Sequence, residues 1–341
     1  MPLLSSCSQV DKNACFPEWK DSSRATLYKP WISQRCLPQL SREPDHYLAP
    51  KMVESTLQVN GASLYYKTIG TGPLLVIIPV GNGTGLFYEP LASHLSSHFR
   101  VLLYDRRGYY RSPADKTPAT DEVFQIHADD AAALIEHVYS SSRNGGAPET
   151  AFILSPSVSV GIGIELLTTR PHLVNKLVLH EPVLASIVPD PIGAQFLSST
   201  GRVLRKALEG DIIGASAMMF PQVHTKAEVD AYRKTSVCRQ LAARISPQEQ
   251  GRWLVTELAA AREFKPDVEK LQRSPYREKL ILICGTDHAP SLSRIPGLCL
   301  GAILRMSIGI VPGGHIGYIT HAREFAECLG NLFVGRDGAR L

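Results

Sequence analysis

One stretch of sequence, residues 151–171, most restricts how this chain can fold. It begins with apolar residues from Ala151 to Leu154, which predict a buried strand, and ends in an apolar helical pattern that stops before Pro171. Small residues lie between the two. A strand that turns directly into a helix leaves no room for large side chains and strains the backbone of its apex residue. The stretch therefore predicts a strand, a sharp turn and a helix packed on that strand.

Three serines, Ser155, Ser157 and Ser159, alternate across this turn, where a nucleophilic turn usually has the pattern Gly-x-Ser-x-Gly. Ser157, at the centre, is the candidate nucleophile. Ser159 is the alternative, because Gly161 follows it at the spacing of the motif. A strand that reached Ser159 would run through Pro156, which cannot donate a ladder hydrogen bond, and this favours Ser157.

The rest of the chain alternates between predicted strands and helices. An Asn-Gly pair at Asn60-Gly61, flanked by alternating apolar residues, predicts an antiparallel hairpin. Nearly continuous apolar runs such as residues 74–80 are typical of buried parallel strands. The sequence therefore predicts an α/β fold with a mostly parallel sheet, an antiparallel N-terminal hairpin and helices on both faces.

The chain divides into four predicted parts. Residues 182–277 interrupt the strand–helix alternation with several helical patterns, and we expect them to form a helical cap over the carboxyl ends of the strands. Residues 1–50 are an N-terminal extension, partly ordered. Residues 51–181 and 278–336 form the core, residues 182–277 the cap, and residues 337–341 a C-terminal tail.

Composition excludes several classes of partner. The net charge is +4 without a dense Lys/Arg block, so no nucleic-acid partner is expected. The seven cysteines are odd in number and lack CxxC spacing, which argues against a disulfide framework or a zinc site and for a reducing compartment. No apolar run reaches the roughly 18 residues of a membrane span.

The C-terminal tripeptide Ala339-Arg340-Leu341 is a variant of the Ser-Lys-Leu address that a peroxisomal import receptor reads. The expected location is therefore the peroxisome, with the cytoplasm as the alternative.

Several segments taken together resemble the α/β-hydrolase superfamily over roughly residues 52–335. Their order and spacing carry the resemblance, and they include the serine turn at Ser157, an Asp-Arg-Arg-Gly segment at 105–108, a His-Glu-Pro segment at 180–182 and a Gly-Gly-His segment at 313–315. Within the superfamily the chain is most similar to fungal hydrolases of secondary-metabolite and host-selective toxin clusters, which include peroxisomal members.

The resemblance implies a catalytic triad in the chain order Ser, acid, His. Ser157, Asp287 and His315 satisfy that order. His315 follows two glycines in a predicted loop between a strand and a helix, and Asp287 lies just past a buried strand. Glu181 is the alternative acid, because some members of the superfamily place the acid after the preceding strand.

The resemblance also implies an oxyanion hole made of backbone N–H groups, here those of Val158 and Gly81. The chemistry needs no organic cofactor and no metal. The expected partner is a small-molecule acyl substrate chosen by the cap, with four large apolar residues as candidates for its wall: Met218, Met219, Phe220 and Trp253.

These features predict a serine hydrolase of esterase or thioesterase type; carbon–carbon bond cleavage uses the same residues. The resemblance implies a role in fungal toxin biosynthesis. The first alternative is an inactive relative that binds a small molecule under its cap. The second is a dinucleotide-dependent oxidoreductase, since Gly81-x-Gly83-x-Gly85 follows a strand and Asp105 ends the next.

Overall fold

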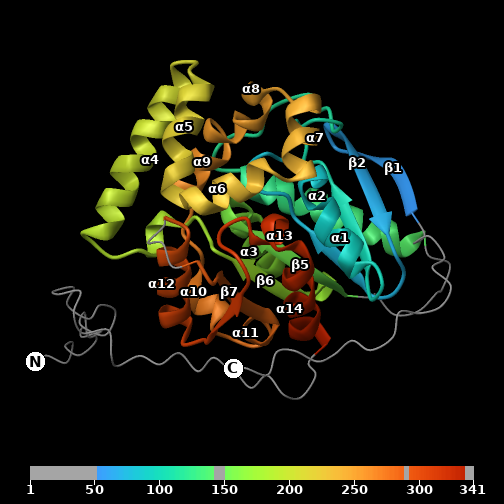
Figure 1. Cartoon of the computed structure of the whole chain (residues 1–341). Helices are drawn as coiled ribbons and strands as arrows, with labels where there is room; N and C mark the ends of the chain where they lie inside the picture. The colour runs from blue at the N-terminus through green and yellow to red at the C-terminus, as the bar shows by residue number, and fades with distance from the viewer. Residues whose placement is uncertain (1–51, 142–149, 288–291, 335–341) are drawn as a thin grey trace, which may run out of the picture. The chain divides into compact units, whose positions relative to one another are not determined.

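The computed structural model of the chain describes residues 52–141, 150–287 and 292–334. The predicted extension over residues 1–50 and the tail over residues 337–341 lie outside these ranges. The described part is built on one sheet of eight strands in the order β1-β2-β4-β3-β5-β6-β7-β8 (Figure 1). The strands are β1 Met52–Val59, β2 Ala62–Ile69, β3 Leu74–Ile77, β4 Arg100–Tyr104, β5 Ala151–Pro156, β6 Val174–His180, β7 Leu280–Gly285 and β8 Ile308–Val311.

The predicted N-terminal hairpin is confirmed, because β1 and β2 pair antiparallel with Val59 opposite Ala62. The turn between them is made by Asn60 and Gly61, and Gly61 has a φ of 75°, a conformation that glycine adopts without strain. Strand β2 also pairs antiparallel with β4, whereas all pairs from β4 through β3 to β8 are parallel. The expected mostly parallel sheet with an antiparallel hairpin is therefore correct.

Helices cover both faces of the sheet, and two clusters of buried apolar side chains lie between the layers. One cluster joins the sheet to α2 and α3, and the other joins it to α1 and α14. Burial on both faces explains why β3 reads as an uninterrupted apolar run. The bounds are α1 Glu89–Leu95, α2 Val123–Ser140, α3 Val160–Thr169, α12 Arg294–Leu304, α13 Gly317–Thr320 and α14 Ala322–Val334.

Helices α4 to α9, which we call the lid, follow β6 and stand together on one side of the sheet (Figure 1). A small apolar core of their own, with Val203, Met219 and Leu258 among its members, holds several of them together. The two helices that follow the lid, α10 and α11, instead contact α12 and β6. The bounds are α4 Ile192–Leu208, α5 Ile212–Val223, α6 Lys226–Arg233, α7 Ser236–Arg244, α8 Pro247–Gln250, α9 Glu257–Glu263, α10 Val268–Leu271 and α11 Tyr276–Lys279.

Within the described ranges, no helix is both long enough and apolar enough to pass through a bilayer.

Candidate active site

The serine turn has the geometry that its sequence predicts. Strand β5 ends at Pro156, a short 3-10 helix of residues 157–159 follows, and α3 begins at Val160. Ser157 has a φ of 57°, the left-handed region that a residue with a Cβ rarely occupies. Close packing of α3 on the strand enforces the turn, since a Cβ on Gly163 would lie 2.7 Å from the Ser155 hydroxyl oxygen. The strained backbone holds Ser157 at the carboxyl end of a central strand.

The flanking serines fill the places where the usual motif has glycine. Ser155 donates a hydrogen bond of 2.6 Å to the carbonyl of Ser159. The Ser159 hydroxyl lies 2.6 Å from the carbonyl oxygen of Pro156, and its side chain is fully buried. Both hydroxyls therefore have partners inside the turn, so the structure places Ser159 in the packing of the turn and Ser157 at the cavity.

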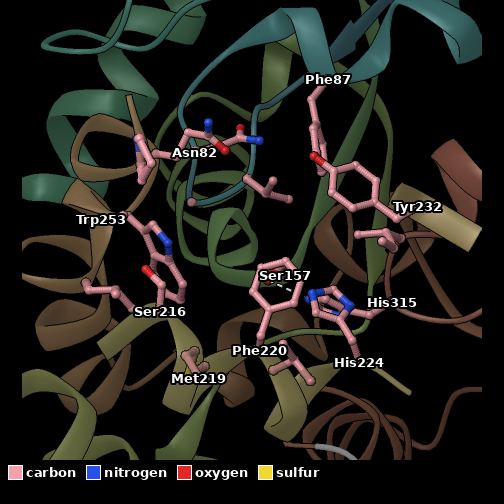
Figure 2. Close-up of a pocket in the computed structure, with 18 of the residues that line it drawn as sticks. Asn82, Phe87, Ser157, Ser216, Met219, Phe220, His224, Tyr232, Trp253 and His315 are labelled. Atoms are coloured by element: carbon pink, nitrogen blue, oxygen red, sulfur yellow. Dashed lines mark hydrogen bonds between the residues drawn. The ribbon is translucent and has the colours of Figure 1, made fainter. Parts of the chain in front are cut away.

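His315 lies on the loop between β8 and α13, and its Nε2 atom is 2.9 Å from the Oγ atom of Ser157 (Figure 2). Gly313, two residues before it, has a φ of 83°, which lets the loop turn sharply toward the sheet. The structure thus brings together the predicted serine and histidine, which are 158 residues apart in the chain.

The carboxylate that contacts His315 belongs to Glu181. Its Oε2 atom is 3.0 Å from Nδ1 of His315, and its Oε1 atom accepts the backbone N–H of Gly285 at 3.0 Å. Burial acts to raise the pKa of Glu181, but the hydrogen bond from His315, the charges of His180 and His315 and the Gly285 N–H outweigh it, so the pKa lies well below its ordinary value. An ionised Glu181 only accepts, so Nδ1 of His315 carries the proton and Nε2 accepts the hydroxyl of Ser157.

This pairing corrects the sequence-based choice of Asp287. Asp287 follows β7, as expected, but its backbone N–H donates to Gly313 and its carbonyl accepts from Arg294. The position beside Nδ1 is taken by Glu181, the alternative acid, whose φ of 45° turns the backbone sharply at the end of β6. The backbone conformation of Glu181 brings its carboxylate, and not that of Asp287, to His315.

The two predicted oxyanion donors lie beside the serine. Val158 directly follows Ser157, and Gly81 lines the cavity from the loop after β3. A Cβ on Gly81 would lie 2.6 Å from the ring of Trp253, so only glycine fits between this loop and the lid.

A buried ion pair fixes the Gly81 loop to the lid. Arg106 donates to the carbonyl of Val80 at 2.9 Å and to Glu257 of α9 at 2.7 Å, and its side chain is fully buried. Tyr109 donates to the same carboxylate at 2.7 Å. In a peptide unit the C=O and N–H point in opposite directions. The hydrogen bond from Arg106 to Val80 therefore sets the direction of the Gly81 N–H.

Protein groups already contact the carboxylate and the central glycine of the dinucleotide-like pattern. Asp105 accepts hydrogen bonds from the Thr84 hydroxyl at 2.7 Å and from the Gly85 N–H at 3.0 Å. It also forms an ion pair with Arg111. A Cβ on Gly83 would lie 2.1 Å from the ring of Tyr109, so this side chain fills the space beside Gly83. Asp105 therefore holds the loop in place, and its carboxylate is already paired.

A cavity of about 260 Å³ lies over Ser157 and His315, and residues of the lid form much of its wall (Figure 2). Met219, Phe220 and Trp253, three of the four predicted wall residues, line it, whereas Met218 packs against the core of the lid. The wall also contains polar lid residues that could not be predicted, because none belongs to a sequence motif: Ser216, His224, Tyr232 and Gln250.

Comparison with known proteins agrees with this architecture. No family model matches the chain. It is 24% identical over 283 residues to the uncharacterized hydrolase YraK of Bacillus subtilis strain 168, which covers 81% of this chain and 94% of that protein. The structure matches the enol-lactonase of Burkholderia xenovorans LB400 with a TM-score of 0.62 and 17% identity, over 83% of this chain and 100% of that one.

A bromoperoxidase from Bacillus anthracis is similar to the same extent, with a TM-score of 0.63 and 18% identity over 83% of this chain and 100% of that one. The likeness to solved structures at this level of identity lies in the fold. The chain thus has the α/β-hydrolase fold, as its sequence predicts, and is a distant relative of bacterial hydrolases.

Proposed function

We propose that the protein is a serine hydrolase that cleaves an ester of a small acyl substrate through Ser157, His315 and Glu181. One observation carries the proposal: a serine with a left-handed backbone lies 2.9 Å from an imidazole whose other nitrogen lies 3.0 Å from a buried carboxylate. This arrangement supplies a nucleophile, a base and the group that orients the base.

In the first half of the reaction His315 Nε2 takes the proton of Ser157 as Oγ attacks the carbonyl carbon of the ester. Glu181 keeps the Nδ1 proton in place and stabilises the imidazolium that forms. The N–H groups of Val158 and Gly81 would bind the negative charge on the carbonyl oxygen. The imidazolium then gives its proton to the leaving alcohol, and an acyl-enzyme remains.

In the second half a water molecule attacks the acyl-enzyme while His315 Nε2 takes one of its protons. The same proton passes to Ser157 Oγ as the bond between the acyl carbon and Oγ breaks, and the carboxylic acid leaves. Apart from the substrate and water, the proposed steps use side chains and backbone groups of this chain.

The cavity wall favours small, largely uncharged substrates. Among the described residues that line it are Phe87, Met219, Phe220 and Leu254, and no lysine or arginine. A charged phosphate group would therefore find no cationic partner in the described wall. An ester fits this wall better than the part of a coenzyme A thioester that carries phosphates, so we propose the ester among the two predicted classes.

The proposed location and pathway depend on the sequence alone. The tripeptide Ala339-Arg340-Leu341, from which the import receptor and the peroxisome are predicted, lies outside the described residues. The role in fungal toxin biosynthesis likewise stays a prediction.

Labelling with a fluorophosphonate probe tests the catalytic role of Ser157. We expect stoichiometric labelling of the wild-type protein and none of Ser157→Ala, because only a serine activated by a neighbouring base reacts readily with such probes. Ser159→Ala is the matched control and should label as the wild type does, since the Ser159 hydroxyl points to backbone carbonyls. Equal labelling of the wild type and Ser157→Ala, or no labelling at all, would favour the alternative of a non-catalytic binding protein.

Gly81→Ala tests the oxyanion hole. The new Cβ would overlap the ring of Trp253 at 2.6 Å and displace either the loop or the lid, so we expect kcat with 4-nitrophenyl butanoate to fall on the order of 10²-fold or more. The double variant Gly81→Ala/Trp253→Ala restores space for the loop and should recover part of the loss. A Gly81→Ala enzyme with wild-type kcat would contradict the expected displacement of this N–H by the overlap with Trp253.

A further inference from the structure

The lid contributes a second buried pair of a histidine and a carboxylate, which the mechanism above does not use. His224, directly after α5, has its Nδ1 atom 3.2 Å from Oε2 of Glu228 in α6. The side chains are only 7% and 2% exposed. His224 lines the same cavity as Ser157, and the centroid of its ring is 5.3 Å from that of His315 (Figure 2).

Glu228 is held in position by the loop that carries His315. Its Oε1 atom accepts the backbone N–H of Ile316 at 2.6 Å. A Cβ on Gly314 would lie 2.9 Å from the same oxygen, so the loop backbone approaches the carboxylate closely. One oxygen of Glu228 is therefore occupied by the loop, and the other is left facing His224.

These contacts fix the tautomer of His224. Because a carboxylate only accepts, Nδ1 carries a proton and Nε2 has a free lone pair. Burial lowers the pKa of His224, and the charge of His315 acts in the same direction, whereas the hydrogen bond that His224 donates to Glu228 raises it; the net shift is downward, so the ring is neutral near neutral pH. The ring of Phe220 lies against it with a centroid distance of 4.6 Å, which restricts its rotation.

His224 lies where its side chain could contact a substrate in the cavity. The two nitrogens of an imidazole point in divergent directions, so Nε2 is turned away from Glu228. The wall of the cavity that His224 lines is mostly apolar and includes Met219 and Val223. A buried acceptor in apolar surroundings favours a ligand that donates a hydrogen bond to it and disfavours one that does not.

We propose that Nε2 of His224 accepts a hydrogen bond from a hydroxyl group on the acyl part of the substrate, close to the carbonyl that Ser157 attacks. The preferred substrates are then hydroxyacyl esters. This inference rests on the proposed function, which supplies the position of the carbonyl.

The test compares the 4-nitrophenyl esters of 3-hydroxybutanoate, 3-methoxybutanoate and butanoate. The methoxy ester has the same oxygen without a proton to donate. We expect wild-type kcat/KM to be about tenfold higher for the hydroxy ester than for the methoxy ester, the ratio that one hydrogen bond typically gives. His224→Leu should bring this ratio close to one, and His224→Gln, which keeps an acceptor oxygen, should retain part of it.

Glu228→Gln tests the tautomer of His224 directly, because it replaces the carboxylate with an amide of nearly the same shape. The amide oxygen would continue to accept the Ile316 N–H, and the amide NH₂ would face Nδ1 of His224. That nitrogen must then accept, so the proton moves to Nε2, which becomes a donor. The ratio of hydroxy to methoxy ester should fall to about one although His224 is unchanged. His172→Leu, which removes an exposed histidine before β6, is the control and should keep the wild-type ratio.

Two further measurements separate the inference from the function on which it rests. Fluorophosphonate labelling of Ser157 should be retained in the His224 variants, which shows that the nucleophile is intact. Isothermal titration calorimetry with the amides of 3-hydroxybutanoate, 3-methoxybutanoate and butanoate repeats the comparison as binding affinities, without ester hydrolysis. If no ester is hydrolysed and Ser157 does not label, the proposed function fails, and the amides still decide the role of His224. A wild-type protein without preference for the hydroxyl group, or a preference that survives His224→Leu, overturns the inference.

Discussion

Glu181→Gln is expected to lower kcat for 4-nitrophenyl butanoate by a factor on the order of 10³ to 10⁴, with little change in KM. Glutamine fills the same space, but its NH₂ group would face Nδ1 of His315, now 3.0 Å from the carboxylate. The imidazole would then carry its proton on Nε2 and could not accept the proton of Ser157. The variant also cannot balance the positive charge that His315 gains in the transition state.

Asp287→Asn is the matched control, and its kcat should remain close to that of the wild type. Its side chain is partly exposed, and the contacts of Asp287 with Gly313 and Arg294 are made by its backbone. Circular dichroism and thermal unfolding of both variants check that each is folded. If Asp287→Asn reduced kcat as much as Glu181→Gln, the assignment of the orienting carboxylate to Glu181 would be wrong.

Glu257→Ala is expected to lower the free energy of unfolding by about 3–5 kcal/mol, because it leaves Arg106 buried without its counter-charge. Arg106 and Glu257 are 0% and 1% exposed and lie 2.7 Å apart, so water cannot replace the lost partner. Urea unfolding monitored by tryptophan fluorescence measures the change. Asp230→Ala, which breaks an exposed pair with Lys226, is the control and should cost less than about 1 kcal/mol.

The contribution of Glu257 to the free energy of unfolding should also depend on pH. Burial acts to raise the pKa of Glu257, but the charge of Arg106 and the hydrogen bonds from His127 and Thr256 outweigh it, so the folded-state pKa lies well below the ordinary value of 4.5. A lowered pKa stabilises the fold above the unfolded-state value and loses this contribution as pH falls toward the folded-state value. The difference in stability between the wild type and Glu257→Ala should therefore be full at pH 7 and shrink below about pH 4.5. A difference that is constant down to pH 3 would contradict the assignment.

Much of the fold could be predicted from the sequence, because its signals are local. The apolar run at β3 and the Asn60-Gly61 turn each depend on a few neighbouring residues. The choice of Ser157 over Ser159 followed from a local fact as well, since Pro156 ends the strand that precedes the turn. Signals of this kind are independent of how distant segments pack.

The acid could not be chosen from the sequence, because Glu181 and Asp287 follow adjacent parallel strands, β6 and β7, and both are near His315 in any such sheet. Two features place the Glu181 carboxylate beside His315: the left-handed backbone of Glu181 and the hydrogen bond that its carboxylate accepts from the N–H of Gly285. The pair of His224 and Glu228 was missed for a related reason. A histidine four residues before a glutamate resembles an ordinary exposed pair until the lid is placed over the sheet.

The contact between Glu228 and the Ile316 N–H also links the lid to the segment that carries His315. An outward movement of α6 would remove the carboxylate that accepts the N–H next to His315, and we would expect the base to be held less firmly in such an open form. A substrate would then enter past Ile213 and Phe220, two exposed apolar side chains of the lid that line the cavity. Hydrolysis would thereby be favoured in closed molecules, in which bulk water has least access to the acyl-enzyme.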